Sequence, residues 1–206
     1  MNRLPVATWN PLGVNYAPAS AALPTVPADG WAKAEILSPA LPAGVTAPAE
    51  ADFGDFAASG MGAETDTWLA ENANLVNHLA VSGTADAPIV FENTLDAAHP
   101  HALTYLTIDA AKGSSLTVVQ VVRGDAENGV SDSLTRIRAA ENAHVTLVQV
   151  QLLGNRARRW NAVAIEQGKS ARVEQVRIEL GGCVVACGAR TLLNHNKCEY
   201  DLDAVY

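Results

Sequence analysis

Hydrophobic and polar residues follow a recurring pattern along the second half of the chain. Three segments of similar sequence succeed one another with shifts of 29 and then 28 residues: 106–122 (LTIDAAKGSSLTVVQVV), 135–152 (TRIRAAENAHVTLVQVQL) and 163–180 (VAIEQGKSARVEQVRIEL). These shifts bring Ile108 onto Ile137 and then onto Ile165. A third shift of 28 residues gives a weaker match, in which Leu193 takes the equivalent position. Self-similarity at a fixed period of this length indicates a repeat architecture.

Within each segment, apolar and polar residues alternate with a period of two, which predicts β-strands rather than helices. The positions of Val119 and Val121 are apolar in every copy, whereas the position between them holds Gln120, Gln149 and Arg177 in turn. Such alternation is typical of a strand with one buried face and one wet face. We therefore expect the valine positions to face a core and the glutamine and arginine positions to face water.

Each copy reads as a short strand, a polar turn and a longer strand, and such a unit cannot bury its own apolar face. Stacked on its neighbours it can, because equivalent aliphatic residues then form ladders. The simplest fold is mainly β: a parallel β-helix with coils of about 28 residues, in which each strand pairs with its equivalent in the next coil. A flattened sandwich of hairpins is the alternative, but hairpins pair adjacent strands and not strands one repeat apart.

The beginning of the chain differs in composition. Eight of the ten prolines lie within residues 1–48, and proline removes backbone donors and blocks helices and central strands. We expect residues 1–63 to form an extended Pro/Ala-rich arm and linker. It should be ordered only where these apolar residues find a surface: Trp9, Leu12, Trp31 and Ile36. Residues 64–84 form a lead-in, either a helix or a strand that begins at His78, and residues 85–206 form the β-helix core, incomplete at its C-terminal end.

Composition and charge narrow the class of protein. Apolar residues make up 49% of the chain but aromatic residues only 5%, so the core must consist of Ala, Val, Leu and Ile. A net charge of −8 argues against nucleic acid or an anionic membrane as the main partner. The run Arg156, Arg158 and Arg159 is interpreted as a solvated turn. No apolar stretch approaches the roughly 20 residues of a membrane helix, and the first residues lack the features of a signal peptide, so we expect a cytoplasmic protein.

Four residues near the C-terminal end form a candidate sulfur or metal site: Cys183, Cys187, His195 and Cys198. Zinc and iron–sulfur clusters require three or four thiolate or imidazole ligands that converge on the metal. In a strand, however, Cys183 and Cys187 share a face but lie roughly 13 Å apart, at ~3.3 Å per residue. The alternative is that both are small buried residues, as free cysteine often is. Transient receipt of sulfur by Cys183 or Cys187 is a hypothesis that substitution of each cysteine would test.

The sequence offers little for independent catalysis. The acidic residues around the junction between arm and core indicate a solvated linker and not an acid–base pair: Asp52, Asp55, Glu64 and Asp66. The chain has neither a glycine-rich phosphate loop with lysine nor the G-x-S-x-G elbow of serine hydrolases. We therefore expect no enzymatic activity of the chain by itself.

The order of elements resembles the central domain of the SufB/SufD family of iron–sulfur cluster assembly proteins. The segments that carry the resemblance are HLAVSGTADAPIVFENTL (78–95), TYLTIDAAKGSSLTVVQVVRG (104–124) and TRIRAAENAHVTLVQVQLLG (135–154). The opening NRLPVATWNPLGVN (2–15) is similar to the N-terminus of short bacterial SufD proteins. The resemblance implies a right-handed parallel β-helix and a cytoplasmic complex with the ATPase SufC and the partner SufB. It also implies a scaffold role, with no cofactor on this chain and an iron–sulfur cluster only transiently in the full complex.

The sequence also departs from the family pattern. Members of the family continue past the β-helix into a helical C-terminal domain, which binds SufC and carries the family's best-known cluster-associated Cys and His. Because the sequence stops at Tyr206, we expect a SufD-like chain truncated before that domain, in which no residue takes those roles.

Two other functions compete with the scaffold. A carbohydrate-active β-helix enzyme would need an export signal and a groove of Asp with Arg or Lys, whereas the outward positions predicted here include Gln151 and Glu179 and carry few charges. A polymerising structural module is the other, since an open last coil exposes strand edges that invite pairing. A homodimer through the β-helix faces or through the open last coil follows from the same reasoning.

Overall fold

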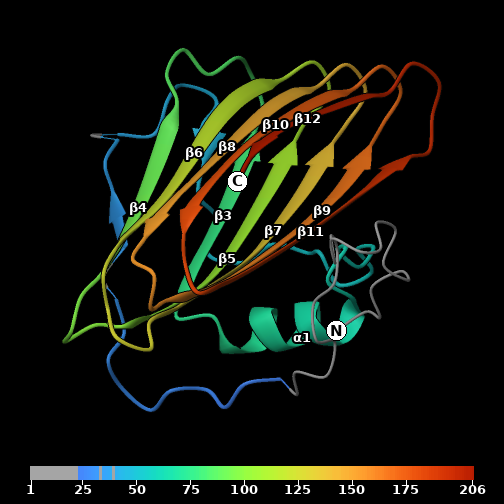
Figure 1. The fold of residues 1–206 in the computed structure, drawn as a ribbon. Coiled ribbons are helices and arrows are strands. Elements are labelled where there is room, and N and C mark those ends of the chain that lie inside the picture. The colour runs from blue at the N-terminus through green and yellow to red at the C-terminus, as the bar shows by residue number, and fades with distance from the viewer. Residues whose placement is uncertain (1–22, 33, 39) are drawn as a thin grey trace.

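The computed structural model describes residues 23–206 except residues 33 and 39. Trp9 and Leu12 of the expected arm lie outside the described residues. The described chain forms two six-stranded sheets that face each other, with one helix, α1 (Ala63–Asn72), beside the second sheet (Figure 1). Within these residues, no helix is long and apolar enough to cross a membrane.

The strands of each sheet follow a simple order. The first sheet contains, in spatial order, β1 (Ala34–Ile36), β4 (Ile89–Leu95), β6 (Ser115–Gly124), β8 (His144–Leu153), β10 (Arg172–Gly181) and β12 (Glu199–Val205). The second sheet contains β11 (Val184–Leu193), β9 (Arg158–Gln167), β7 (Val130–Ala139), β5 (His101–Ala110), β3 (Leu75–Val81) and β2 (Val45–Thr46). Successive strands alternate between the sheets, and each of β5 to β12 pairs in parallel with the strand two places earlier. This is a parallel β-helix, as the repeat predicts.

The register confirms the ladder. Ile108 pairs with Ile137, and Ile137 pairs with Ile165, on successive strands of the second sheet. All three side chains are fully buried between the sheets. The two strands of each complete coil are equally long, however, at 10 residues each. The prediction that the first strand of each repeat is the shorter one was therefore wrong. The aligned segments left out the first residues of β5, β7 and β9.

The turn after each of these strands is built alike. Four equivalent positions adopt a left-handed backbone, with φ between 56° and 69°: Gly113, Asn142, Ser170 and Lys197. Glycine and asparagine adopt this conformation at low cost, and serine and lysine adopt it less readily. Backbone hydrogen bonds join neighbouring turns, as from Gly113 N to Glu141 O (2.9 Å) and from Asn142 N to Lys169 O (2.9 Å). The repeated turn keeps the coils in register.

The assignment of faces on the first sheet was wrong. Gln149 and Arg177 point inward and are buried, whereas Val148 and Val176 point outward and are half exposed. The physical reason is that apolar residues occupy consecutive positions in each strand, such as Leu147 and Val148. The alternation is therefore compatible with either residue of the pair facing the core. The inward aliphatic residues of this sheet are instead Leu116, Val118, Val145, Leu147 and Val173.

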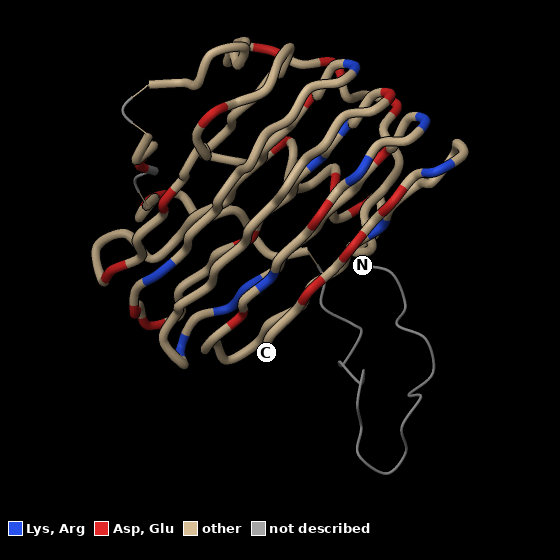
Figure 2. The backbone as a smooth tube through the Cα atoms, turned by 90° about the horizontal axis from the view of Figure 1, so that it is seen from above, with Lys and Arg blue, Asp and Glu red and all other residues tan. Residues whose placement is uncertain are grey.

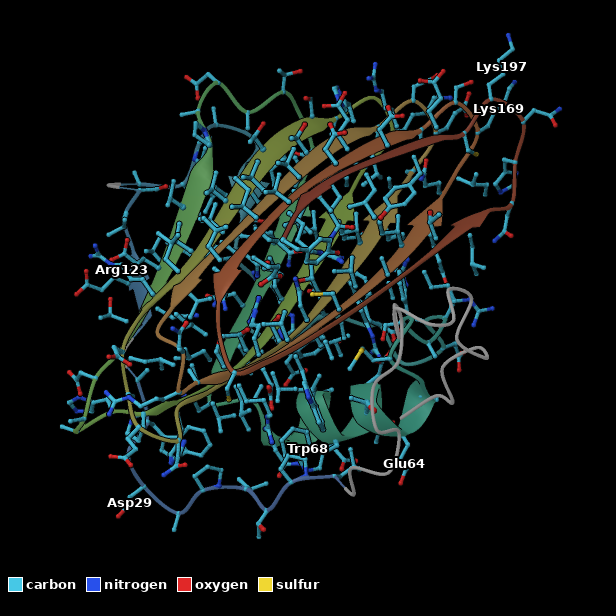
Figure 3. The ribbon with its side chains drawn as sticks, in the orientation of Figure 1. Asp29, Glu64, Trp68, Arg123, Lys169 and Lys197 are labelled. Atoms are coloured by element: carbon cyan, nitrogen blue, oxygen red, sulfur yellow. The ribbon has the colours of Figure 1, made fainter. Side chains whose placement is uncertain are left out.

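The lead-in holds both a helix and a strand. α1 ends at Asn72, and β3 begins at Leu75, three residues before the strand start considered from sequence. α1 covers the outer face of the second sheet, where Leu69 and Met61 pack with Leu103, Leu134 and Trp160. The space between the two sheets is filled by side chains (Figure 3).

The described part of the arm is partly a sheet element. Residues 34–36 and 45–46 form short antiparallel strands that pair with β4 and β3. Ile36, expected to find a surface, is 51% exposed instead, while Trp31 packs edge-on against His101. Phe53, which was not singled out from sequence, is buried.

One carboxylate of the junction is not solvated. Asp66 is buried, and its two oxygens accept hydrogen bonds from the backbone N–H (2.6 Å) and the hydroxyl (2.5 Å) of Ser59. Composition alone suggested a solvated linker for this residue, but the contact with a hydroxyl only seven positions earlier depends on the tertiary path of the arm.

Candidate functional site

The space between the two sheets has an aliphatic half and a polar half. The aliphatic half contains the isoleucine ladder. The polar half, here called the polar interior, is lined from both sheets by ten residues: Gln120, Ser133, Gln149, Gln151, Arg159, Asn161, Gln175, Arg177, Glu179 and Cys187. Buried polar groups are costly unless they are hydrogen-bonded. An interior of this kind therefore needs a structural or a functional reason.

Asn161 lies at the centre of the polar interior and links the two sheets. Its Nδ2 donates hydrogen bonds to Gln149 Oε1 (3.1 Å) and Glu179 Oε1 (3.2 Å) on the opposite sheet. Its Oδ1 accepts from Ser133 Oγ (3.1 Å) and from Gln149 Nε2 (3.1 Å). Gln149 Nε2 also donates to Gln120 Oε1 (2.9 Å), so the network runs from one coil to the next.

The network acquires charge in the later coils. Arg159 and Glu179 have almost no exposed side-chain surface, and Arg159 Nε lies 4.0 Å from Glu179 Oε2. Arg159 Nη1 donates to the hydroxyl (3.1 Å) and the carbonyl (3.3 Å) of Ser131. Arg177 brings a second guanidinium, so the buried charges of these three residues sum to +1. Along the axis of the β-helix, the polar interior therefore changes from glutamine and serine side chains in the earlier coils to ionised side chains in the later coils.

Several buried atoms of the polar interior have no hydrogen-bond partner within the described protein. They are Nε2 and Oε1 of Gln151, Nε of Arg159, Nε and Nη2 of Arg177, and Oε2 of Glu179. Such atoms in native proteins usually contact ordered water or a ligand. Three of the unpaired donors belong to guanidinium groups, so a small anion satisfies them better than a cation, whereas Glu179 Oε2 and Gln151 Oε1 are acceptors that need a donor such as water.

A small cavity adjoins the earlier coils of the polar interior, and Arg159 is among the residues that line it. It measures about 30 Å³ and is lined among others by Asn77, Asn93, Gln120 and Ser133. A water molecule requires roughly 10–15 Å³ of such space and two to four polar partners. The cavity therefore has room and hydrogen-bonding groups for water or for a species of similar size.

Cys187 places a thiol in the polar interior. Its Sγ lies 3.4 Å from Glu179 Oε1, as a donor to that carboxylate. Burial and, to a smaller extent, the negative charge of Glu179 raise the pKa of this thiol from 9.0 to about 12. The thiolate is the nucleophile and metal ligand, so Cys187 is held in its protonated and least reactive form.

The other three residues of the sequence-derived set lie elsewhere. Cys183 is exposed just before β11, and His195 is exposed in the turn after it. Cys198 follows in the same turn, with its Sγ near the carbonyl oxygens of His195 (3.0 Å) and Gly168 (3.2 Å). Six residues of strand at ~3.3 Å each, or roughly 20 Å, separate Cys187 from that turn. Over the described residues, no group of three or more Cys, His, Asp and Glu is arranged to hold a metal ion.

Sequence reasoning missed the main polar residues of the site. Arg159 was placed in a solvated turn, but it points inward from β9 and is 5% exposed. Arg156 does lie in such a turn, paired with Asp125 (3.1 Å). Arg158 pairs with the buried Asp132 and lies over the ring of Trp160. The alignment of the repeats could have identified these residues. Ser133, Asn161 and Cys187 occupy the same position in three successive coils, and all three are polar or weakly polar.

Asn161→Ala is expected to lower the free energy of unfolding by about 3 kcal/mol, because it leaves buried amide, hydroxyl and carboxylate groups unpaired. Urea unfolding followed by circular dichroism measures this change. Asn196→Ala in an exposed turn is the matched control and should change stability by less than about 0.5 kcal/mol. Equal effects of the two substitutions would contradict the network described here.

Comparison with known proteins gave one match. A family model described as "SUF system FeS cluster assembly, SufBD core domain" matches residues 93–206, which is more than half of the chain. The matched residues span the end of β4 and all strands from β5 to β12, and they contain all ten residues of the polar interior. Searches among curated proteins and among solved structures gave no match.

Proposed function

Because the chain belongs to the SufBD core family of the SUF iron–sulfur cluster assembly system, we propose that it acts as a SufD-like scaffold subunit of a cytoplasmic assembly complex. The match over residues 93–206 is the observation that carries this proposal. The family is one of assembly scaffolds and not of catalysts. Its partners would be SufB-like and SufC-like subunits, and the iron–sulfur cluster would be cargo of the full complex.

The fold suits a scaffold. Eight parallel strand pairings in continuous register connect the coils. Each pairing fixes the next coil relative to the last through hydrogen bonds and stacked side chains. Groups docked at different coils would therefore keep a constant distance from each other.

The polar interior supports a more specific role in holding sulfur. Sulfide and persulfide species are small anions near neutral pH, and the unpaired guanidinium donors of Arg177 provide a complementary charge. The thiol of Cys187 lies in the same interior, where it donates to Glu179 Oε1. We therefore assign the polar interior as a transient site for a sulfur-bearing anion during assembly.

The two cysteines considered for sulfur receipt differ in access. Cys183 is exposed, so a sulfur donor protein can reach its thiol directly. Cys187 is half buried, and its pKa of about 12 leaves few thiolates to react at neutral pH. If a cysteine of this chain receives sulfur from another protein, Cys183 is the better acceptor, while Cys187 contributes to the interior.

Reconstitution with SufB-like and SufC-like subunits from the same genome tests the proposal. We expect the chain to co-purify with them, and we expect Arg177→Gln to slow cluster formation, followed by visible absorbance, at unchanged complex yield. Arg156→Gln, an exposed arginine, is the matched control. Absence of any complex would reject the scaffold role. A complex whose rate is unaffected by Arg177→Gln would reject only the role of the polar interior.

The carbohydrate-active alternative gains no support from the described surface. The outward positions at the middle of β6, β8 and β10 are valine and isoleucine. They are not the acidic and basic groups on which polysaccharide cleavage depends.

A further inference from the structure

A histidine at the start of β5 holds part of the arm. The backbone N–H of His101 donates to Gly30 O (3.0 Å), and its carbonyl accepts from Ala32 N (2.7 Å). Between these two arm residues, Trp31 forms an isolated parallel bridge with His101. The indole ring packs edge-on against the imidazole, with 6.2 Å between the ring centroids. Residues 29–32, here called the latch, therefore dock against His101 through both backbone and side chain.

The latch covers apolar side chains on the outer face of the second sheet. Trp31 and Leu23 pack against the buried cluster that joins α1 to this sheet, which includes Leu69 and Leu103. Ala32 is buried as well. Release of the latch would therefore expose apolar surface to water while the strands beneath it remain paired.

The imidazole of His101 is poorly placed to carry a charge. Its Nδ1 is buried and has no hydrogen-bond partner within the described protein. Neutral imidazole carries one N–H, and the cation carries an N–H on both nitrogens. Whichever nitrogen is protonated in the neutral form, the cation of the docked ring would therefore bury an N–H on Nδ1 without an acceptor, which is costly.

Two charged groups from different elements act on this ring, Asp29 of the arm (Figure 3) and Arg158 of β9. Arg158 is itself paired with the buried Asp132 of β7. Acidic and basic residues are interspersed over the rest of the chain (Figure 2). Burial lowers the pKa of His101 below its ordinary 6.5, Asp29 opposes this shift, and Arg158 adds to it. The docked ring is therefore neutral at pH 7.

The other four histidines of the chain lack this combination of features. His99 and His144 lie beside carboxylates, which would accept their second proton. The Nδ1 of His78 is already hydrogen-bonded, and His195 is exposed. A buried unpaired Nδ1 and direct hydrogen bonds to the arm occur together at His101.

We propose that His101 makes docking of the latch sensitive to pH, so that mild acid releases residues 29–32 from the start of β5. In the released form the imidazole is hydrated and takes up a proton at its ordinary pKa, whereas the docked ring has a lowered pKa. Since the released form binds the proton more readily, acid favours release. The effect begins as the pH falls through about 6.5 and levels off below the pKa of the docked ring. This switch is independent of the SUF role proposed above.

Hydrogen–deuterium exchange of the complete chain, followed by mass spectrometry, tests the switch. The amide of Ala32 donates to His101 O and is protected while the latch is docked. After correction for the intrinsic effect of pH on exchange, the opening of the latch should be constant above pH 7. It should increase by up to about tenfold between pH 6.5 and pH 5.5, because uptake of one proton gives at most tenfold per pH unit.

His101→Phe removes the titrating group and keeps a ring for the edge-on contact with Trp31. Its latch should be equally protected at pH 7.5 and pH 5.5. His195→Gln alters an exposed histidine in a distant turn and is the matched control, so it should keep the pH dependence of the wild type. Circular dichroism at both pH values would confirm that each variant is folded.

Asp29→Asn tests the switch without altering His101. Asp29 is exposed, so the fold should tolerate the change. The substitution removes the charge that favours the imidazolium in the docked form, and it should increase release at pH 5.5 by about a further twofold, the size of an exposed charge interaction. A wild-type latch that is equally protected from pH 7.5 to pH 5.5 overturns the proposal. So does an unchanged pH dependence in His101→Phe, since another group would then account for it.

Discussion

Replacing Ile137 by alanine should lower the free energy of unfolding by about 4 kcal/mol. Ile137 is fully buried between Ile108 and Ile165, and the register on both sides prevents the coils from closing around the missing atoms. The substitution removes apolar contact area and also leaves a cavity in the aliphatic half of the interior. The midpoint of urea unfolding, followed by far-ultraviolet circular dichroism, measures the loss.

Val150→Ala is the matched control for Ile137→Ala. Val150 belongs to a strand of the same length and is equally central, but it points outward and is half exposed. Its truncation should cost less than about 1 kcal/mol. If Val150→Ala were as destabilising as Ile137→Ala, the assignment of inward and outward faces would be wrong.

The thiol of Cys187 should react with iodoacetamide about a thousandfold more slowly in the folded chain than in urea. The pKa of this thiol is raised from 9.0 to about 12 in the folded state, mainly by burial. Three pKa units reduce the thiolate fraction about a thousandfold at any pH below 9. The rate in the folded chain should therefore keep rising with pH beyond 9 and level off only near 12.

The variant Cys183→Ser/Cys198→Ser isolates this signal, because Cys187 is then the single cysteine. Mass spectrometry of the alkylated chain gives its rate. Cys187→Ser/Cys198→Ser leaves the exposed Cys183 and should be alkylated readily in both states. Equal rates for Cys187 in buffer and in urea would mean that the thiol is not enclosed as described. Glu179→Gln should raise the folded-state rate, since it removes a negative charge 3.4 Å from the sulfur.

The cysteines show what could not be predicted from the sequence. The spacing of Cys183 and Cys187 argued against one shared metal ion on a straight strand, whereas in the structure β11 begins at Val184, so only Cys187 lies on the strand. The sequence could not reveal that the thiol of Cys183 is exposed while the thiol of Cys187 lies beside a buried carboxylate. That difference arises because β11 faces β10 across the interior, which brings Glu179 to Cys187.

The sequence by itself determined the repeat, the strands and the stacking of equivalent residues. A period of 28 to 29 residues admits few ways to bury aliphatic side chains, and the paired isoleucines followed from it. The family came separately, from the resemblance of three segments to SufB/SufD proteins, and the match over residues 93–206 confirms it.

Only the tertiary structure decided which face of the first sheet is inside. Leu147 and Val148 are adjacent and both apolar, so either phase of alternation reads equally well along one strand. The choice depends on the opposite sheet, where Asn161 and Ser133 face inward and require partners such as Gln149. Hydrogen bonding across the interior, and not hydropathy along the strand, therefore turned the glutamines inward and left the valines outside.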